Sequence, residues 1–188
     1  MIKDFYIKNM VCDRCIKVLQ DELKEKEIEL LEIELGKIKL NIQDSEDKTI
    51  LISILEKNGF SLIDSPEKQL VEQVKMELIK LLQQLPLDID RKLSVYLEEK
   101  LQKDYSKTSK LFSIKEGITI ERYFIKLKIE KVKELVQNQE YNFTEIGQLL
   151  NYSNINHLSR QFKTETGMSL TNYKAQQRND RSSLDRII

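Results

Sequence analysis

The sequence contains few glycines and prolines and no long apolar run. Its 188 residues include only five glycines and two prolines, too few for a fold built from many short strands and turns. No apolar run approaches 18 residues, so we expect no membrane span. The first residues are not a basic segment followed by an apolar stretch. No secretory signal is therefore expected, and the cytoplasm is the expected compartment.

The residues that would indicate an enzyme are scarce as well. The sequence has no phosphate-binding glycine-rich loop, no acidic pair in an evident pocket, and a single histidine, His157. We therefore expect a protein that is not an enzyme.

The charges balance overall but not along the chain. Residues 1–65 hold 10 Lys and Arg against 14 Asp and Glu, whereas residues 86–188 hold 18 against 14. The C-terminal half is thus the part where a polyanion such as DNA would bind, although a surplus of this size needs a motif beside it.

The first 65 residues have the pattern of a small α+β domain. Alternating strands, helical spacing and a hairpin signal at Gly36 follow one another in the order β-α-β-β-α-β. The predicted strands are residues 4–8, 28–35, 37–42 and 60–63, and the predicted helices are 15–26 and 46–57. This order predicts a ferredoxin-like domain, with two helices on a four-stranded antiparallel sheet.

A connector helix is predicted from Pro66 to about Leu85, where Pro86 ends it. Its apolar residues lie on one stripe: Leu70, Val74, Leu78, Leu81 and Leu85. Two partners for this stripe stay open, the chain's own domains and a second copy of the chain in a homodimer.

The remaining half is helical in pattern and contains an internal repeat. Residues 112–123 and 162–173 both read Phe-x4-Gly-apolar-Ser/Thr-apolar-x-x-Tyr. Six positions agree at identical spacing, so this half is two copies of one unit. A long helix from about Ile120 to Gln137 joins them. It would hold both copies on one side, at major grooves roughly one helical turn apart.

In the second copy, Thr144 is expected to cap a first helix and Ser153 a second, with the turn at Asn151. Leu158 and Phe162 would form the inner face of the second helix. The residues left outside are Asn156, His157, Ser159, Arg160 and Lys163. Short polar groups and an arginine that reach base edges are typical of a recognition helix.

The first copy has a plainer outer face. Asp104 is expected to cap a helix over residues 105–112. Its outward residues are Ser106, Lys107, Ser109 and Lys110. Lysine is a flexible point charge, so Lys107 and Lys110 suit phosphates better than bases.

The run YSNINHLSRQFKTETGMSLTNY, residues 152–173, resembles the signature of the AraC/XylS-type transcription regulators of bacteria, and the likeness covers about residues 93–178. The resemblance implies two helix-turn-helix units that bind double-stranded DNA sequence-specifically. The first copy departs from the pattern, because Gln102 and Lys103 stand where a Gly and an apolar residue are common. Thr108 also takes an inner position that is usually Leu. We expect the first unit to pack loosely and to read bases less strictly than the second.

Cys12 and Cys15, the only cysteines, lie where the first strand gives way to the first helix. At positions i and i+3 of a helix start, both sulfurs can point to one spot. The amides there and the charge of Arg14 are expected to lower the thiol pKa and favour thiolate. Such a pair suits a soft metal ion.

The N-terminal domain resembles heavy-metal-associated (HMA-like) domains, whose loop reads Gly-Met-x-Cys-x-x-Cys. Here Met10, Cys12 and Cys15 match, and Asn9 replaces the Gly. A closed zinc site needs four ligands, so within one protomer two cysteines do not suffice for Zn(II). They suit Cu(I), or a site shared across a dimer or with a metal donor protein. A thiol redox sensor and a plain interaction module stay open as alternatives.

The expected layout is an HMA-like domain at residues 1–65, a connector at 66–86, a tandem helix-turn-helix domain at 87–180 and a tail at 181–188. The expected function is transcription regulation by sequence-specific DNA binding, with the N-terminal domain sensing or relaying a soft metal ion. The alternative is a metal-trafficking protein or thiol redox sensor that uses its helices to dock a partner.

Overall fold

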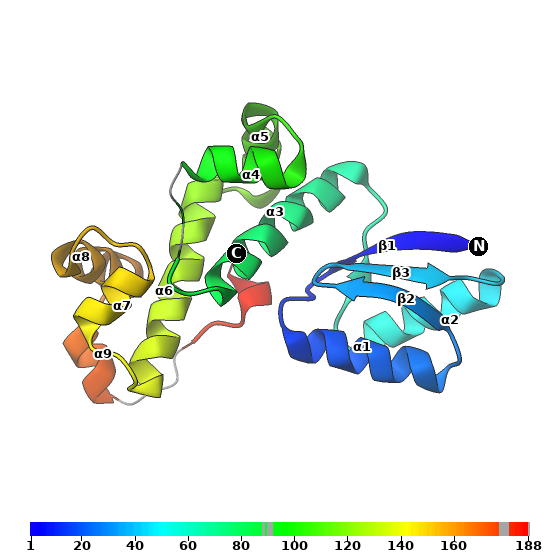
Figure 1. The fold of residues 1–188 in the computed structure, drawn as a ribbon, viewed down its shortest axis with the longest axis horizontal. Coiled ribbons are helices and arrows are strands. Elements are labelled where there is room, and N and C mark those ends of the chain that lie inside the picture. Colours follow the sequence, from blue (N-terminus) through cyan, green and yellow to red (C-terminus); the bar gives the residue numbers. More distant parts are fainter. Residues whose placement is uncertain (88, 90–91, 177–180, 188) are drawn as a thin grey trace. The chain divides into compact units, whose positions relative to one another are not determined.

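The computed structural model describes residues 1–87, 89, 92–176 and 181–187. The chain divides into two compact units, Met1–Met76 and Glu77–Ile188 (Figure 1). The division falls within helix α3 (Pro66–Gln83), in the segment expected as the connector. The finer four-part layout stays a prediction, and its boundary at residue 180 lies outside the described residues.

The N-terminal unit has its strands and helices in the predicted order. They are β1 (Ile2–Lys8), α1 (Asp13–Glu25), β2 (Glu29–Glu34), β3 (Lys37–Asn41), α2 (Ser45–Lys57) and β4 (Ser61–Leu62). The strands form one antiparallel sheet in the order β2-β3-β1-β4. Several bounds differ from the prediction, and β1 begins two residues before Asp4. Helix α1 begins two residues before Cys15, and β4 is only two residues long because it pairs with β1 only opposite Ile7 and Lys8.

The two faces of the sheet differ because side chains alternate along a strand. Ile7, Ile38 and Leu40 are fully buried in a core to which α1 contributes Leu19 and Leu23 and α2 contributes Leu51 and Leu55. The opposite face is polar and internally paired. Lys37 meets Asp4 at 3.0 Å, Lys39 meets Glu32 at 2.6 Å, and Asn41 Nδ2 donates to Glu29 at 2.8 Å. Two acidic side chains of this face are therefore paired with lysines of the same unit.

Helix α3 is buried on more than the single predicted stripe. Of the predicted stripe, Val74, Leu78 and Leu81 are buried, whereas Leu70 and Leu85 are half-buried. Outside the stripe, Ile79 and Leu82 are buried as well. Burial within the chain therefore covers much of this helix, which is the first of the two predicted arrangements. A homodimer stays a prediction.

The C-terminal unit is helical beyond α3. Its elements are α4 (Leu93–Leu101), α5 (Tyr105–Glu116), α6 (Ile120–Asn138), α7 (Phe143–Leu149), α8 (Ile155–Thr166), α9 (Leu170–Gln176) and the short 3₁₀ turn η1 (Leu184–Arg186). Within the part of the chain that the structure describes, no helix is long and apolar enough to cross a bilayer.

The sequence repeat is also a structural repeat. The rings of Phe112 and Tyr123 lie 5.6 Å apart, and those of Phe162 and Tyr173 lie 5.4 Å apart, so the same aromatic pair packs in both copies. Helices α5 and α8 end alike, at glycines with φ of 74° and 78° at positions 117 and 167. Only glycine adopts that conformation without strain. Helix α5 therefore runs past Phe112, the residue at which it was predicted to end, and stops at Gly117.

Helix α6 is the central element of this unit, with α5 and α8 both in contact with it (Figure 1). Its buried residues include Tyr123, Phe124, Leu127, Val132 and Leu135. Its apolar side is therefore shared between the two copies of the repeat.

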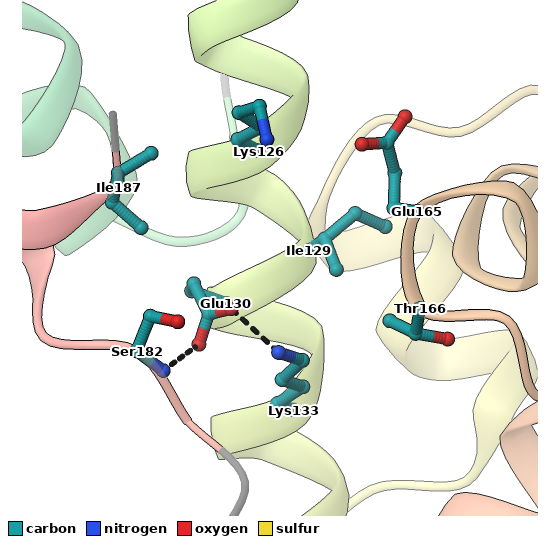
Figure 2. A pocket seen from close by; sticks show the side chains of 8 residues that line it. All are labelled: Lys126, Ile129, Glu130, Lys133, Glu165, Thr166, Ser182 and Ile187. Carbon is teal, nitrogen blue, oxygen red and sulfur yellow. Dashed lines mark hydrogen bonds and ion pairs between the residues drawn. The ribbon is translucent and has the colours of Figure 1, made fainter.

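The tail that follows α9 is bound to α6 by one buried carboxylate. Glu130 is 6% exposed, accepts from the Ser182 amide at 2.8 Å and pairs with Lys133 at 2.6 Å (Figure 2). Arg181 adds a contact to Glu134 at 2.8 Å. A pocket of about 160 Å³ lies beside this attachment, lined among others by Lys126 and Ile129 of α6, Glu165 and Thr166 of α8, and Ile187.

We expect Glu130→Ala to lower the free energy of unfolding by about 1.5–3 kcal/mol, because it removes a charged acceptor from two hydrogen-bonding groups. Urea denaturation measures this loss, and hydrogen exchange of residues 181–186 should become faster. Glu134→Ala is the matched control. Its more exposed pairs should contribute less than about 1 kcal/mol each. Equal losses in the two variants would contradict the assignment of Glu130 as the anchor.

Candidate nucleic-acid interface

Asparagines cap both helices of the helix-turn-helix in the second copy, and the two predicted caps were wrong. Asn142, not Thr144, caps α7. Its side chain accepts from the amides of residues 144 and 145, and the Asn142 amide donates to the Glu145 carboxylate. Asn154, not Ser153, caps α8 by accepting from the His157 amide at 2.9 Å. The pattern had placed both caps one or two residues away, because Thr and Ser compete with Asn for this role in sequence.

The turn between α7 and α8 is as predicted. Asn151 has φ of 54°, a left-handed conformation that Asn tolerates better than most residues. Tyr152, next in the turn, is 7% exposed. Its hydroxyl donates to Gln161 of α8 at 2.7 Å, which fixes the turn to the helix that follows.

Helix α8 separates its two faces as the sequence predicted. Leu158 and Phe162 are fully buried. The residues predicted for DNA contact lie on the other side, with Asn156, His157, Arg160 and Lys163 exposed and Ser159 half-buried. Backbone and inner contacts thus hold the helix, while its outward polar groups stay available to base edges.

An ion pair also holds α8 on α6. Arg122 of α6 bonds to Glu165 of α8, whose side chain is 6% exposed. Because the carboxylate is buried, loss of the arginine would leave a desolvated charge without its partner. This contact joins residues 43 positions apart, and no local pattern reveals it.

The first copy has the same layout with a different surface. Asp104 caps α5 by accepting from the Lys107 amide at 2.8 Å, as predicted. Ser106, Lys107 and Lys110 are exposed and Ser109 is half-buried, so the four predicted contact residues share one side of the unit's second helix. The face carries lysines and hydroxyls only, which suits phosphate contact more than bidentate base reading.

Two of the three departures in the first copy have structural answers. Gln102 takes the left-handed position with φ of 52° and donates to the Glu99 carbonyl at 2.7 Å. Thr108 is 3% exposed, but its hydroxyl donates to the Asp104 carbonyl at 2.8 Å, so no buried polar group lacks a partner there. Tyr105 bonds to Glu121 of α6, and burial raises the pKa of the Tyr105 hydroxyl.

The cysteine pair lies in the N-terminal unit, at the start of α1. The two sulfurs are 3.3 Å apart and both are reduced and half-buried. Asn9, which replaces a glycine of the resembled loop, has φ of 72° and donates to the Gly59 carbonyl at 3.2 Å. The loop therefore keeps the backbone path that the glycine would allow.

The expected thiolate is not supported for Cys15. Burial raises the pKa of the Cys15 thiol, and the hydrogen bond with Cys12 raises it further. Loss of hydration outweighs the backbone amides at the helix start, which act in the opposite direction. Among the described residues, no group of three or more His, Cys, Asp or Glu side chains is arranged to hold a metal ion. The donor set is two thiols, which fits a two-ligand soft ion but not a closed zinc site.

Comparison with known proteins finds a family match within the helical half of the chain. Residues 97–176 match the family model of a helix-turn-helix domain. The C-terminal domain of AraT, a response regulator from Geobacillus stearothermophilus, is similar at 24% identity and a TM-score of 0.50, over 60% of this chain and 86% of that one. No curated protein matches the chain.

Two further solved structures are weaker likenesses. One is the C-terminal domain of the two-component response regulator yesN from Fusobacterium nucleatum, at 25% identity and a TM-score of 0.46, over 58% of this chain and 99% of that one. The other is an AraC-type regulator from Chromobacterium violaceum, at 14% identity and a TM-score of 0.49, over 58% and 96%. Residues 97–176 of the C-terminal unit thus match a helix-turn-helix domain. The N-terminal likeness stays a prediction.

The position of the α7 cap can be tested by mutation. Asn142→Ala should lower the free energy of unfolding by about 1 kcal/mol, because two amides at the start of α7 lose their acceptor. Thr144→Ala, at the residue that the sequence pattern favoured, should change it by less than about 0.5 kcal/mol. Thermal or urea denaturation compares the two variants, and a larger loss from Thr144→Ala would show the cap to be misassigned.

Proposed function

We propose that this protein is a transcription regulator that binds double-stranded DNA sequence-specifically through two helix-turn-helix units. The observation that carries the proposal is the duplication. Two copies with the same aromatic pair and the same glycine cap each present an exposed polar helix face. A helix with such a face is suited to the major groove.

The two faces imply different duties. Asn156 and Arg160 carry groups that form bidentate bonds with adenine and guanine. The first copy offers Lys107 and Lys110, whose charges reach phosphates. We therefore infer that α8 reads most of the sequence and that α5 mainly fixes the protein on the backbone.

DNA binding itself is tested first, with the full chain and an operator selected from random or genomic DNA. A regulator should prefer the selected site over scrambled DNA, and its affinity should fall steeply as salt rises. A carrier protein that uses its helices only to dock a partner would show neither behaviour.

Arg160→Ala should weaken binding to the selected site by about 1–3 kcal/mol and relax preference at one base pair. Lys110→Ala is the control for a phosphate contact. It should weaken all sequences alike and lower the slope of log affinity against log salt by about one. Selection on each variant distinguishes the two, and a uniform loss from Arg160→Ala would make that residue a backbone contact instead.

For the N-terminal unit we propose a ferredoxin-like, HMA-like domain that relays a signal through its cysteine pair. Cys12 and Cys15 would hold Cu(I), or Zn(II) if a second protomer or a metal donor protein completes the site. The bound ion would supply a positive charge and a link between the two thiolates. Because burial raises the pKa of Cys15, metal binding must displace a thiol proton and should strengthen as pH rises.

Replacing both cysteines by serine should abolish stoichiometric binding of Cu(I) or Zn(II) while circular dichroism stays unchanged. The pair is half-buried, and Cys15 packs against a core whose fully buried residues are all others, so we expect the fold to tolerate the change. Metal titration under reducing conditions gives the result. If the wild type binds no metal, thiol redox sensing or a plain interaction module remains for this domain. DNA binding measured with and without reductant then separates those two.

A further inference from the structure

Lys128 connects the central helix to the turn of the second helix-turn-helix unit. Its ammonium nitrogen lies 3.8 Å from the centre of the Tyr152 ring. Lys128 belongs to α6 and Tyr152 to the turn between α7 and α8, so the contact joins two separate elements. A cation this close to an aromatic face is attracted by the ring electrons, and more strongly where water is excluded.

The same ring reaches α8 in two further ways. The Tyr152 hydroxyl donates to Gln161 at 2.7 Å. The edge of the ring meets the His157 ring at 5.3 Å, with the two planes at 84°. His157 lies on the exposed face that we assign to DNA, and its Nδ1 is 3.2 Å from Ser153. The Tyr152 side chain thus contacts both the Lys128 ammonium of α6 and His157 on the outer face of α8.

The surroundings of Lys128 favour the ring as its partner. Among the described residues, no carboxylate forms an ion pair with it. Burial lowers the pKa of Lys128 to about 8, so the side chain is mostly charged at pH 7 and mostly neutral at pH 9. Charged or titratable groups near the pair include Glu165 of α8, which is bonded to Arg122 of α6, and His157.

We propose that Lys128 is a positioning residue for DNA binding: its ammonium holds the Tyr152 ring, and through that ring it sets the orientation of α8. The proposal rests on the proposed DNA-binding function, and it extends that function to a residue outside both recognition helices. The competing explanation is that Lys128 merely fills space. A methionine of similar length would then serve equally well.

Binding to the selected operator tests the proposal through Lys128→Met and Lys128→Arg, measured by fluorescence anisotropy. At pH 7 we expect the Met variant to bind at least about fivefold more weakly, a loss of about 1 kcal/mol, which lies within the range of a cation–π contact. The Arg variant, which keeps the charge, should stay within about twofold of the wild type. Equal affinity of the Met variant and the wild type would overturn the proposal.

The dependence of the affinity on pH and salt distinguishes this role of Lys128 from others. Between pH 7 and 9 the wild type should weaken toward the Met variant, because Lys128 loses its proton. The Arg variant, which shares every other titrating group, should not show this loss. The slope of log affinity against log salt should be the same in all three proteins. A decrease of about one in the Met variant would mean that Lys128 contacts a phosphate, which would also overturn the proposal.

A second measurement needs no DNA. His157 is the only histidine, so the proton on its Cε1 gives one assignable NMR signal. That signal should move in the Met variant, as the Tyr152 ring turns, and stay in place in the Arg variant. If the wild type binds no DNA while the signal behaves this way, the proposed function fails but the positioning of α8 stands. An unmoved signal together with unchanged affinity would reject the positioning role. Should the Met variant fail to fold, the pH comparison of the wild type with the Arg variant decides.

Discussion

The C-terminal unit depends on the burial of one long helix. Helix α6 carries Tyr123, Leu127 and Val132 into the interior, and both copies of the repeat contact it. The burial of each such side chain stabilises the fold by about 1.5–3 kcal/mol. Because one helix serves both copies, α5 and α8 are held by a common rigid element. Their outer faces therefore keep a fixed spacing and orientation, as the proposed contact of both helices with one DNA duplex requires.

Polar contacts then make the two copies unlike each other. The second is attached to α6 by the Arg122–Glu165 pair and by the Lys128 ammonium on the Tyr152 ring. The first is attached through Tyr105 and Glu121. Polar contacts add less free energy than the apolar core, but they depend on the angle between the groups. They can therefore fix the orientation of a helix that is to contact base edges. The copy with asparagine and arginine on its outer face is thus the one that carries the Arg122–Glu165 pair and the Lys128–Tyr152 contact.

The N-terminal unit shows two opposing electrostatic effects at one site. The start of α1 offers backbone amides that favour a thiolate, whereas partial burial of the Cys12–Cys15 pair removes hydration and favours the thiol. Burial prevails at Cys15. A soft metal ion would have to displace the thiol proton, and this competition makes the occupancy of such a site sensitive to pH as well as to metal concentration.

The sequence by itself determined the order of the elements, the repeat and the outward faces of α5 and α8. These follow from local periodicity and from glycines at positions 117 and 167, where few other residues fit. It did not determine the caps at Asn142 and Asn154, because neighbouring Ser and Thr have similar propensities and only backbone geometry selects among them. Nor did it reveal Glu130, Lys128 or the raised pKa of Cys15. Those depend on which distant side chains exclude water around a charge, and only the tertiary structure decides that.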